Sequence, residues 1–176
     1  MEEGRGVAVG ETVSDVAAPL VSPEGGVEET SLGALADDGP VLVCFYTLDF
    51  SPDCVEEWCA FRDFDWFSAG DVRVVGASKS GITFHRWFID RLDLGFSLYA
   101  DEDLALAEAF DVDYRAFGVF RRSRRSCFLL GGDLTVRYRW LGEHWLDPTL
   151  SVPPVEEVYA GVTDALDRPE PETFGF

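Results

Sequence analysis

Residues 40–59 read PVLVCFYTLDFSPDCVEEWC. The apolar run at 40–46 is typical of a central strand covered on both faces, because such a strand has no side that needs to face water. Ser51 followed by Pro52 is typical of a helix start, with serine as the N-cap and proline at the first helical position. The stretch therefore predicts a buried strand, a polar turn and a helix over residues 52–69.

Strand-like and helix-like runs alternate along the rest of the chain. Strands are predicted at 72–77, 96–99, 126–130 and 135–141, and helices at 82–92, 104–110 and 154–166. The residues Gly131-Gly132-Asp133 between the last two strands are a hairpin signal. Residues 1–40 are predicted to be a leading segment with room for a hairpin. The alternation predicts an α/β fold with a central mixed β-sheet flanked by helices on both faces.

The length favours a single domain. A chain of 176 residues is long enough to bury a core and short for two domains. The sequence shows neither an internal repeat nor a linker. We therefore expect one domain over residues 1–176, with a core of about 10–166 and a tail at 167–176.

The charge of the chain is strongly negative. It holds 14 Lys and Arg residues against 33 Asp and Glu, a formal net charge of −19, and Lys79 is its single lysine. Nucleic acid and anionic membrane surfaces are poor partners, because both bind proteins through basic residues. Hydrophobic residues at 47% exclude a disordered acidic chain. Well-spread carboxylates keep a protein soluble at high salt, so the composition favours a halophile's protein over an ordinary mildly acidic enzyme.

The N-terminus predicts a cytoplasmic protein. Glu2 and Glu3 stand where a signal peptide would place basic residues, and no run approaches the roughly 18 apolar residues of a membrane span. The four cysteines, in an apparently cytosolic chain, do not indicate a disulfide scaffold. They are core residues, metal ligands or reactive thiols, and their surroundings distinguish these options.

Cys54 has the surroundings of a reactive thiol. It falls in the first turn of the predicted helix, where unsatisfied N–H groups and the helix dipole favour a thiolate. Asp53, Glu56 and Glu57 oppose this, because they would raise the pKa of the thiol unless their side chains point into water.

Cys59 lies five residues after Cys54. In a continuous helix that separation is about 7.5 Å along the axis, beyond the roughly 7 Å limit between the Cα atoms of a disulfide. The two thiols are therefore either a redox couple that requires local unwinding or two unrelated core residues. We expect no metal site, because only His85 and His144 remain to help and neither has ligand spacing. His85 is predicted to be a partly exposed surface residue and His144 a loop residue.

The other two cysteines, Cys44 and Cys127, lie inside apolar strands and are predicted to be inert core thiols. A dithiol exchange protein of the thioredoxin kind is excluded. The chain has no C-x-x-C motif, and no proline between Pro52 and Pro148 to supply the cis-proline that faces such a dithiol.

The stretch from Tyr46 to Asp63 resembles the peroxiredoxins, most closely the bacterioferritin comigratory protein or peroxiredoxin Q subgroup. The subgroup's pattern is Tyr-Pro-x-x-x-Thr-x-x-Cys-x-x-x-x-Cys-x-x-Arg-Asp, which Cys54, Cys59 and Arg62-Asp63 match in spacing. Individually weaker matches follow at 74–78, 98–101, 125–130 and 131–133. The resemblance runs from about residue 10 to residue 166.

The resemblance implies a role for each site residue. Cys54 would be the peroxidatic thiolate, which attacks the peroxide O–O bond and becomes a sulfenic acid, and Cys59 the resolving thiol of an intrachain disulfide. Ser51 would replace the threonine whose hydroxyl holds the peroxide. Arg125 would supply the guanidinium that stabilises the thiolate and the developing charge on oxygen. Thr47 stands where the family has a proline that shields the thiolate, so it is a candidate positioning residue.

The segment 121–125 reads RRSRR. It offers several guanidiniums, and the register with the following strand favours Arg125 as the one at the site. The family further implies a thioredoxin-like fold, a peroxide substrate, no metal or organic cofactor and an external thiol reductant such as a thioredoxin. The chain would be a monomer or a homodimer. The departures at Thr47 and Ser51 keep an alternative open, a redox-sensing or interaction module of the same fold with little peroxidase turnover.

Overall fold

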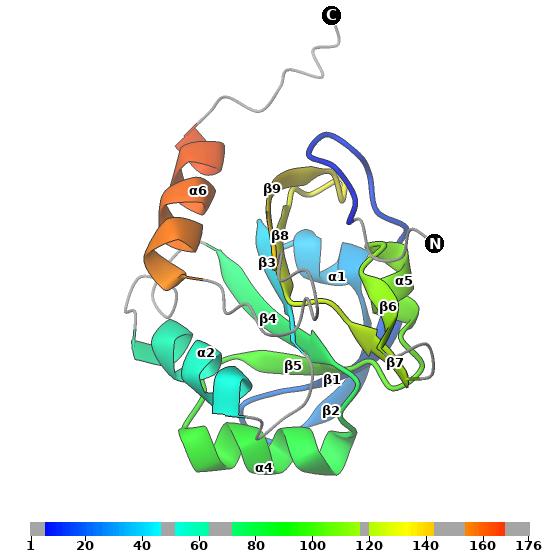
Figure 1. The fold of residues 1–176 in the computed structure, drawn as a ribbon, viewed down its shortest axis with the longest axis vertical. Coiled ribbons are helices and arrows are strands. Elements are labelled where there is room, and N and C mark those ends of the chain that lie inside the picture. Colours follow the sequence, from blue (N-terminus) through cyan, green and yellow to red (C-terminus); the bar gives the residue numbers. More distant parts are fainter. Residues whose placement is uncertain (1–5, 47–51, 64–71, 117–119, 143–153, 168–176) are drawn as a thin grey trace, which may run out of the picture.

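The computed structural model describes residues 6–46, 52–63, 72–116, 120–142 and 154–167 (Figure 1). Its strands are β1 (Ala17–Val21), β2 (Val27–Ser31), β3 (Val41–Phe45), β4 (Arg73–Ser78), β5 (Ser97–Ala100), β6 (Asp113–Ala116), β7 (Phe120–Ser123), β8 (Ser126–Leu130) and β9 (Val136–Leu141). Its helices are α1 (Leu32–Ala36), α2 (Pro52–Asp63), α4 (Ile82–Leu92), α5 (Ala105–Ala109) and α6 (Val155–Asp167).

Seven of the strands form one mixed sheet in the order β2-β1-β5-β4-β3-β8-β9. The pairs β3–β4 and β4–β5 are parallel, whereas β1, β2, β8 and β9 join in antiparallel pairs. β3 lies inside the sheet with all five residues buried. The predicted continuous apolar strand is thus confirmed, because neighbours on both edges and helices on both faces leave it no contact with water.

Helices cover both faces of this sheet, as predicted. One buried cluster joins Leu42 and Cys44 of β3 to Trp58 of α2, Phe88 of α4 and Val158 of α6. The other face packs against α1 and α5 in a second buried cluster. Figure 1 shows the same division, with α2, α4 and α6 on one side of the sheet and α1 and α5 on the other.

The leading segment does contain a hairpin, β1–β2, with Val21 opposite Val27. Gly25 at φ +90° makes its turn, and the N–H of Gly25 donates to the carbonyl of Ser22 (2.9 Å). A backbone in this left-handed region favours glycine because it has no Cβ to clash. Strands β6 and β7, which the sequence did not predict, pair antiparallel with Asp113 opposite Ser123.

The predicted helix at 82–92 and strand at 126–130 match α4 and β8. The other predicted elements agree to within one or two residues, except that α2 is described only to Asp63. Strand boundaries of this kind depend on sheet pairing, which local sequence does not specify.

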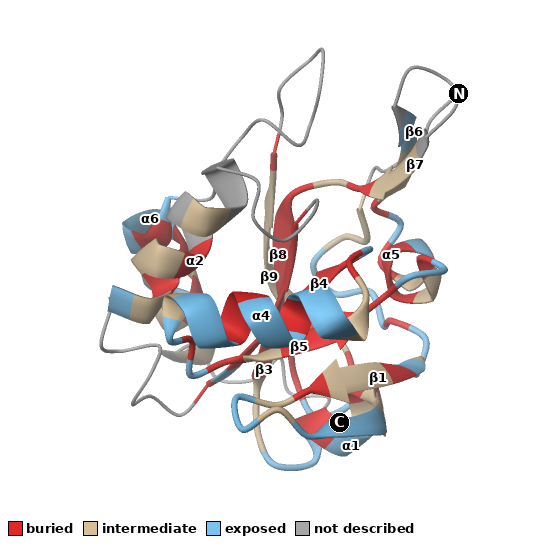
Figure 2. Ribbon diagram, turned by 90° about the horizontal axis from the view of Figure 1, so that it is seen from below, coloured by how far each residue is buried: buried red, intermediate tan, exposed pale blue. Residues whose placement is uncertain are grey.

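The prediction for His85 was wrong. His85 is fully buried, together with Phe88 and Ile89, while Phe84 and Trp87 on the same helix are exposed. Figure 2 shows α4 with buried and exposed segments side by side. The helix therefore turns its histidine to the sheet and two of its aromatic rings to water, against the usual polarity.

No helix in the described part of the chain is long and apolar enough to cross a membrane.

Candidate active site

Position 54, where the sequence predicts the nucleophile, lies in the first turn of α2. The helix begins at Pro52, shortly after β3 ends at Phe45, so it starts at the carboxyl edge of the parallel strands. Open α/β sheets place their sites at this edge. The side chain of Cys54, and Ser51 and Thr47 entirely, fall outside the described residues.

Trp58 holds α2 on the sheet. It comes four residues after Cys54, so the two positions share one face of the helix. The Trp58 side chain is fully buried, and its ring centroid lies 5.6 Å from that of Tyr46 and 5.6 Å from that of Phe96. Position 54 therefore shares the helix face that Trp58 packs against the sheet.

Cys59 lies elsewhere on the helix surface. It is half-buried, and the helix is unbroken from Pro52 to Asp63. Five residues of α-helix turn the chain about 140° away from position 54 and advance it about 7.5 Å. The unbroken helix gives positions 54 and 59 the backbone separation expected from the sequence, so a bond between the two residues would need this part of α2 to unwind.

Arg62 holds the C-terminal end of α2 in place. Its Nη1 donates to the carbonyl of Leu92 at the end of α4 (2.6 Å), and its Nε donates to Asp63 (2.9 Å). The hydrogen bond to Asp63 raises the pKa of Arg62, and the same bond lowers the pKa of the Asp63 carboxyl. An unwinding of α2 would therefore start from its first turns, since Arg62 and Trp58 hold the later ones.

A buried histidine supports Tyr46, the last described residue before position 47. The His85 Nε2 lies 2.8 Å from the carbonyl oxygen of Tyr99, and Nδ1 lies 3.4 Å from the Tyr46 hydroxyl. A carbonyl only accepts, so Nε2 donates to it, and in the neutral imidazole Nδ1 then faces the Tyr46 hydroxyl as acceptor. Ser123 also donates its hydroxyl to the carbonyl of Tyr46 (2.9 Å). Sequence reasoning missed both contacts, because they join distant segments.

The structure separates the arginines of the segment 121–125. Arg121 forms ion pairs with Glu108 and Asp113, which raise its pKa. Arg124 donates its Nε to the carbonyl of Gly142 (2.7 Å).

Arg125 differs from both in its burial and its place. Its side chain is only 1% exposed. It directly precedes Ser126, which pairs with Phe45, so Arg125 lies beside the end of β3 where the chain turns toward α2. The position agrees with the register argument from the sequence, and the contact of Arg125 with the thiol stays a prediction.

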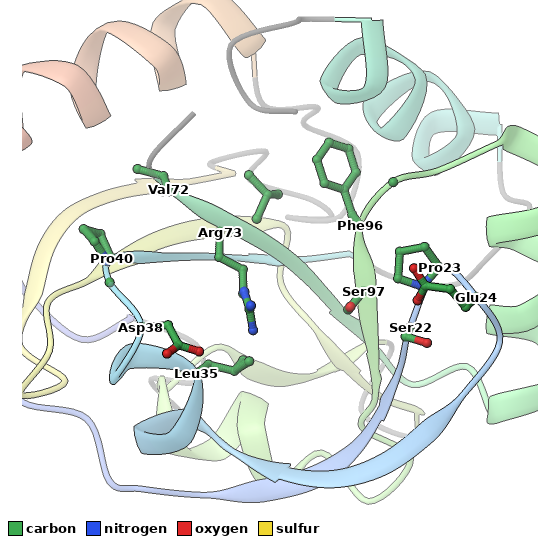
Figure 3. Close-up of a pocket in the computed structure, with 13 residues that line it drawn as sticks. Ser22, Pro23, Glu24, Leu35, Asp38, Pro40, Val72, Arg73, Phe96 and Ser97 are labelled. Carbon is green, nitrogen blue, oxygen red and sulfur yellow. The ribbon is translucent and has the colours of Figure 1, made fainter. Parts of the chain in front are cut away.

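A cavity of about 500 Å³ lies at the opposite edge of the sheet, at the amino ends of β3, β4 and β5 (Figure 3). Arg73 and Asp38 line it. It is separate from the start of α2, because these parallel strands run from this edge to that one. No group of three His, Cys, Asp or Glu side chains suited to a metal ion occurs within the described ranges.

Comparison with known proteins identifies the family. The model of the AhpC/TSA family matches residues 9–139. A putative peroxiredoxin bcp of Coxiella burnetii is 32% identical over 104 residues, which are 57% of this chain and 69% of that protein. The chloroplastic peroxiredoxin Q of Sedum lineare is 35% identical over 80 residues, 45% of this chain and 43% of that protein.

Solved structures agree in fold. A cysteine-to-serine variant of PrxQ from Xylella fastidiosa superposes with a TM-score of 0.75 at 22% identity, covering 93% of this chain and all of that one. The mixed sheet flanked by helices is thus the thioredoxin-like fold that the sequence predicted. With the family match over residues 9–139, the chain belongs to the AhpC/TSA family, the peroxiredoxins, whose enzymes are thiol peroxidases.

Proposed function

We propose that this chain reduces hydrogen peroxide and alkyl hydroperoxides, with Cys54 as the peroxidatic thiol and Cys59 as the resolving thiol. The observation that carries the proposal is the place of position 54. It lies in the first turn of α2, at the carboxyl edge of the central strands, on the helix face that Trp58 turns toward the sheet. A helix N-terminus favours the thiolate, which is the reactive form.

The proposed reaction has three steps. The Cys54 thiolate attacks one peroxide oxygen, the O–O bond breaks, and the second oxygen leaves as water or an alcohol after it takes a proton. The Cys59 thiolate then attacks the sulfur of the resulting sulfenic acid, which forms the disulfide and releases water. An external dithiol such as a thioredoxin returns both thiols and is itself oxidised to a disulfide.

Three further residues have proposed roles. Arg125 would stabilise the thiolate and the charge that develops on the leaving oxygen. Ser51 would donate its hydroxyl to the peroxide, and Thr47 would shield the thiolate where the subgroup has proline. The burial of Arg125 supports its part, because a guanidinium held in one place needs little reorganisation during the reaction.

The net charge of −19 supports a further part of the proposal, a cytoplasmic enzyme of a salt-rich cell. The substrates are small and, for hydrogen peroxide, uncharged, so the acidic surface has no part in binding them. It would instead keep the protein dissolved where salt screens its self-repulsion.

Peroxide consumption by the purified chain at high salt tests the proposal. The wild-type chain should consume peroxide through repeated turnovers when a dithiol reductant is supplied. Cys54→Ser should lose activity, whereas Cys59→Ser should complete one turnover and stall. Cys44→Ala is the matched control, since it removes a thiol that has no role in this reaction. Unchanged turnover in Cys54→Ser would end the proposal.

The rate of alkylation of Cys54 against pH separates the enzyme from the redox-sensing module. Asp53, Glu56 and Glu57 beside Cys54 favour the module, because carboxylates destabilise a thiolate. A midpoint well below the ordinary 8.5 or so supports the peroxidase, and one at or above it supports the module.

A further inference from the structure

Two cysteines that the proposed reaction does not use lie directly opposite each other. Cys44 of β3 pairs with Cys127 of β8 in an antiparallel register. Both are thiols in the structure, and both are fully buried. They were predicted to be core thiols, which their burial confirms, but the sequence contains no sign that the sheet brings them together.

The backbone hydrogen bonds show which kind of pair they form. The N–H of Tyr46 donates to the carbonyl of Ala77 on β4 (3.1 Å), so the backbone of Tyr46 faces β4. Backbone groups alternate along a strand, and Cys44, two residues earlier, therefore also turns its N–H and C=O toward β4. Cys44 and Cys127 are thus a non-hydrogen-bonded pair, the kind in which side chains approach most closely.

This geometry suits a disulfide. The Cα atoms of a non-hydrogen-bonded pair are about 4.5 Å apart, inside the range of roughly 4.4 to 6.8 Å that a disulfide spans. Both side chains belong to one buried cluster and so lie on the same face of the sheet. Cys44 and Cys127 can therefore close with small backbone shifts, whereas Cys54 and Cys59 need α2 to unwind.

Tyr138 of β9 and helix α6 cover the two cysteines. Tyr138 packs against the buried cluster that contains both of them. Burial raises the pKa of its hydroxyl, and negative charge on Cys127, Glu157 and Cys44 raises that pKa further. A Cβ added to Gly161 of α6 would overlap the ring of Tyr138. α6 therefore packs directly on Tyr138, and a peroxide reaches the sulfurs only when this cover opens.

We propose that Cys44 and Cys127 are a second dithiol couple, which hydrogen peroxide closes into a cross-strand disulfide when α6 opens locally. One thiolate attacks the peroxide, breaks the O–O bond and becomes a sulfenic acid while water leaves. The other thiolate attacks that sulfur, forms the S–S bond and releases a second water. Two thiols are oxidised by two electrons, and one peroxide is reduced to two waters.

The disulfide would stabilise the centre of the site. Cys44 lies two residues before Tyr46, and Cys127 two residues after Arg125. A bond between β3 and β8 would fasten the two strand ends that hold these residues. It would also restrict the unfolded chain over the long loop from residue 44 to residue 127, so the oxidised protein should unfold at a higher temperature.

The test uses the variant Cys54→Ser with Cys59→Ser, which retains only this couple, so a failure of the proposed peroxidase does not affect the outcome. Hydrogen peroxide should remove two hydrogen atoms from the protein mass and yield a crosslinked peptide pair on non-reducing proteolysis. The unfolding midpoint should rise by several degrees and return on reduction. Dilute urea should speed the closure, because it opens the cover.

Adding Cys127→Ala to that variant is the matched control, and it should show neither crosslink nor rise in midpoint. The same peptide pair should form in the wild-type chain under excess peroxide, which removes any dependence on the serine variants. The proposal is overturned if both cysteines remain alkylatable after long oxidation in dilute urea. It is equally overturned if they are recovered as separate sulfinic acids or as links between two chains.

Discussion

The indole ring of Trp58 rests on Gly76: a Cβ at that glycine would lie 2.5 Å from a carbon of the ring and 2.6 Å from Leu98. At Gly76, β4 therefore passes beneath α2 with no side chain between its backbone and the indole ring. Because Trp58 is one turn after Cys54, this contact sets how closely the first turns of α2 approach the sheet.

Replacement of Gly76 by alanine should move α2. The added methyl group has no space, and overpacking of this kind costs about 1–3 kcal/mol. We expect a lower free energy of unfolding in urea together with a loss of peroxidase activity larger than the unfolded fraction explains. Gly95→Ala is the control, since a Cβ there meets nothing within 4 Å. Equal activity in the two variants would mean that the distance between α2 and the sheet does not affect the reactivity of Cys54.

Arg125 and Arg124 form a matched pair for testing the cation of the site. Arg125→Lys should lower kcat/KM by roughly a hundredfold, the usual cost of losing a donor at the developing oxyanion. Arg124→Lys should retain most of the activity, because the Arg124 guanidinium is bound to the carbonyl of Gly142. Steady-state peroxide consumption by the folded variants gives the two values of kcat/KM to be compared. A larger loss in Arg124→Lys would assign the role to Arg124 instead.

The sequence predicted helices and strands best where a short run of neighbouring residues was enough to specify them. The apolar run of β3 and the serine–proline start of α2 belong to contiguous residues, so their outcome did not depend on distant partners. The spacing of Cys54 and Cys59 likewise follows from helix geometry alone.

Prediction from the sequence failed where contacts between distant segments determine whether a residue is buried and which residue it faces. His85 is buried because the carbonyl of Tyr99 and the hydroxyl of Tyr46 satisfy its ring, and neither residue is near it in sequence. The register that brings Cys44 opposite Cys127 comes from strands that are far apart in the chain. A histidine on an amphipathic helix is usually exposed, and only tertiary contacts reverse that expectation.

Asp101 should make stability depend on pH. Its carboxylate is only 1% exposed and accepts the N–H groups of Leu106 (2.9 Å) and Ala107 (3.0 Å) at the start of α5. Burial raises its pKa above the ordinary value of 3.8, and the two backbone hydrogen bonds only partly offset this. The folded chain thus holds this proton more tightly than the unfolded chain. Its contribution to stability is present below about pH 3.8 and falls as the pH rises through the folded pKa.

Asp101→Asn isolates that contribution. Asparagine cannot titrate, and it offers one acceptor where two N–H groups need one each. The free energy of unfolding of each protein is measured in urea at pH 4 and at pH 7, at the same salt concentration. The wild-type chain should be more stable than the variant by a larger margin at pH 4 than at pH 7. Asp90→Asn, at an exposed position of α4, should show no such change. An advantage that grows with pH would mean that the folded pKa of Asp101 lies below the unfolded one.

Salt should stabilise the chain. At a net charge of −19 the folded surface repels itself, and the Debye length falls from about 10 Å at 0.1 M salt to about 3 Å at 1 M. The urea midpoint should therefore rise steeply up to about 1 M potassium chloride and little beyond it. The β1–β2 hairpin offers a matched variant, because Glu24, Glu28 and Glu29 are all exposed there. Their joint replacement by glutamine should raise the midpoint at low salt and shrink the gain from added salt. If wild type and the triple variant gain equally, self-repulsion of surface carboxylates is not what the salt relieves.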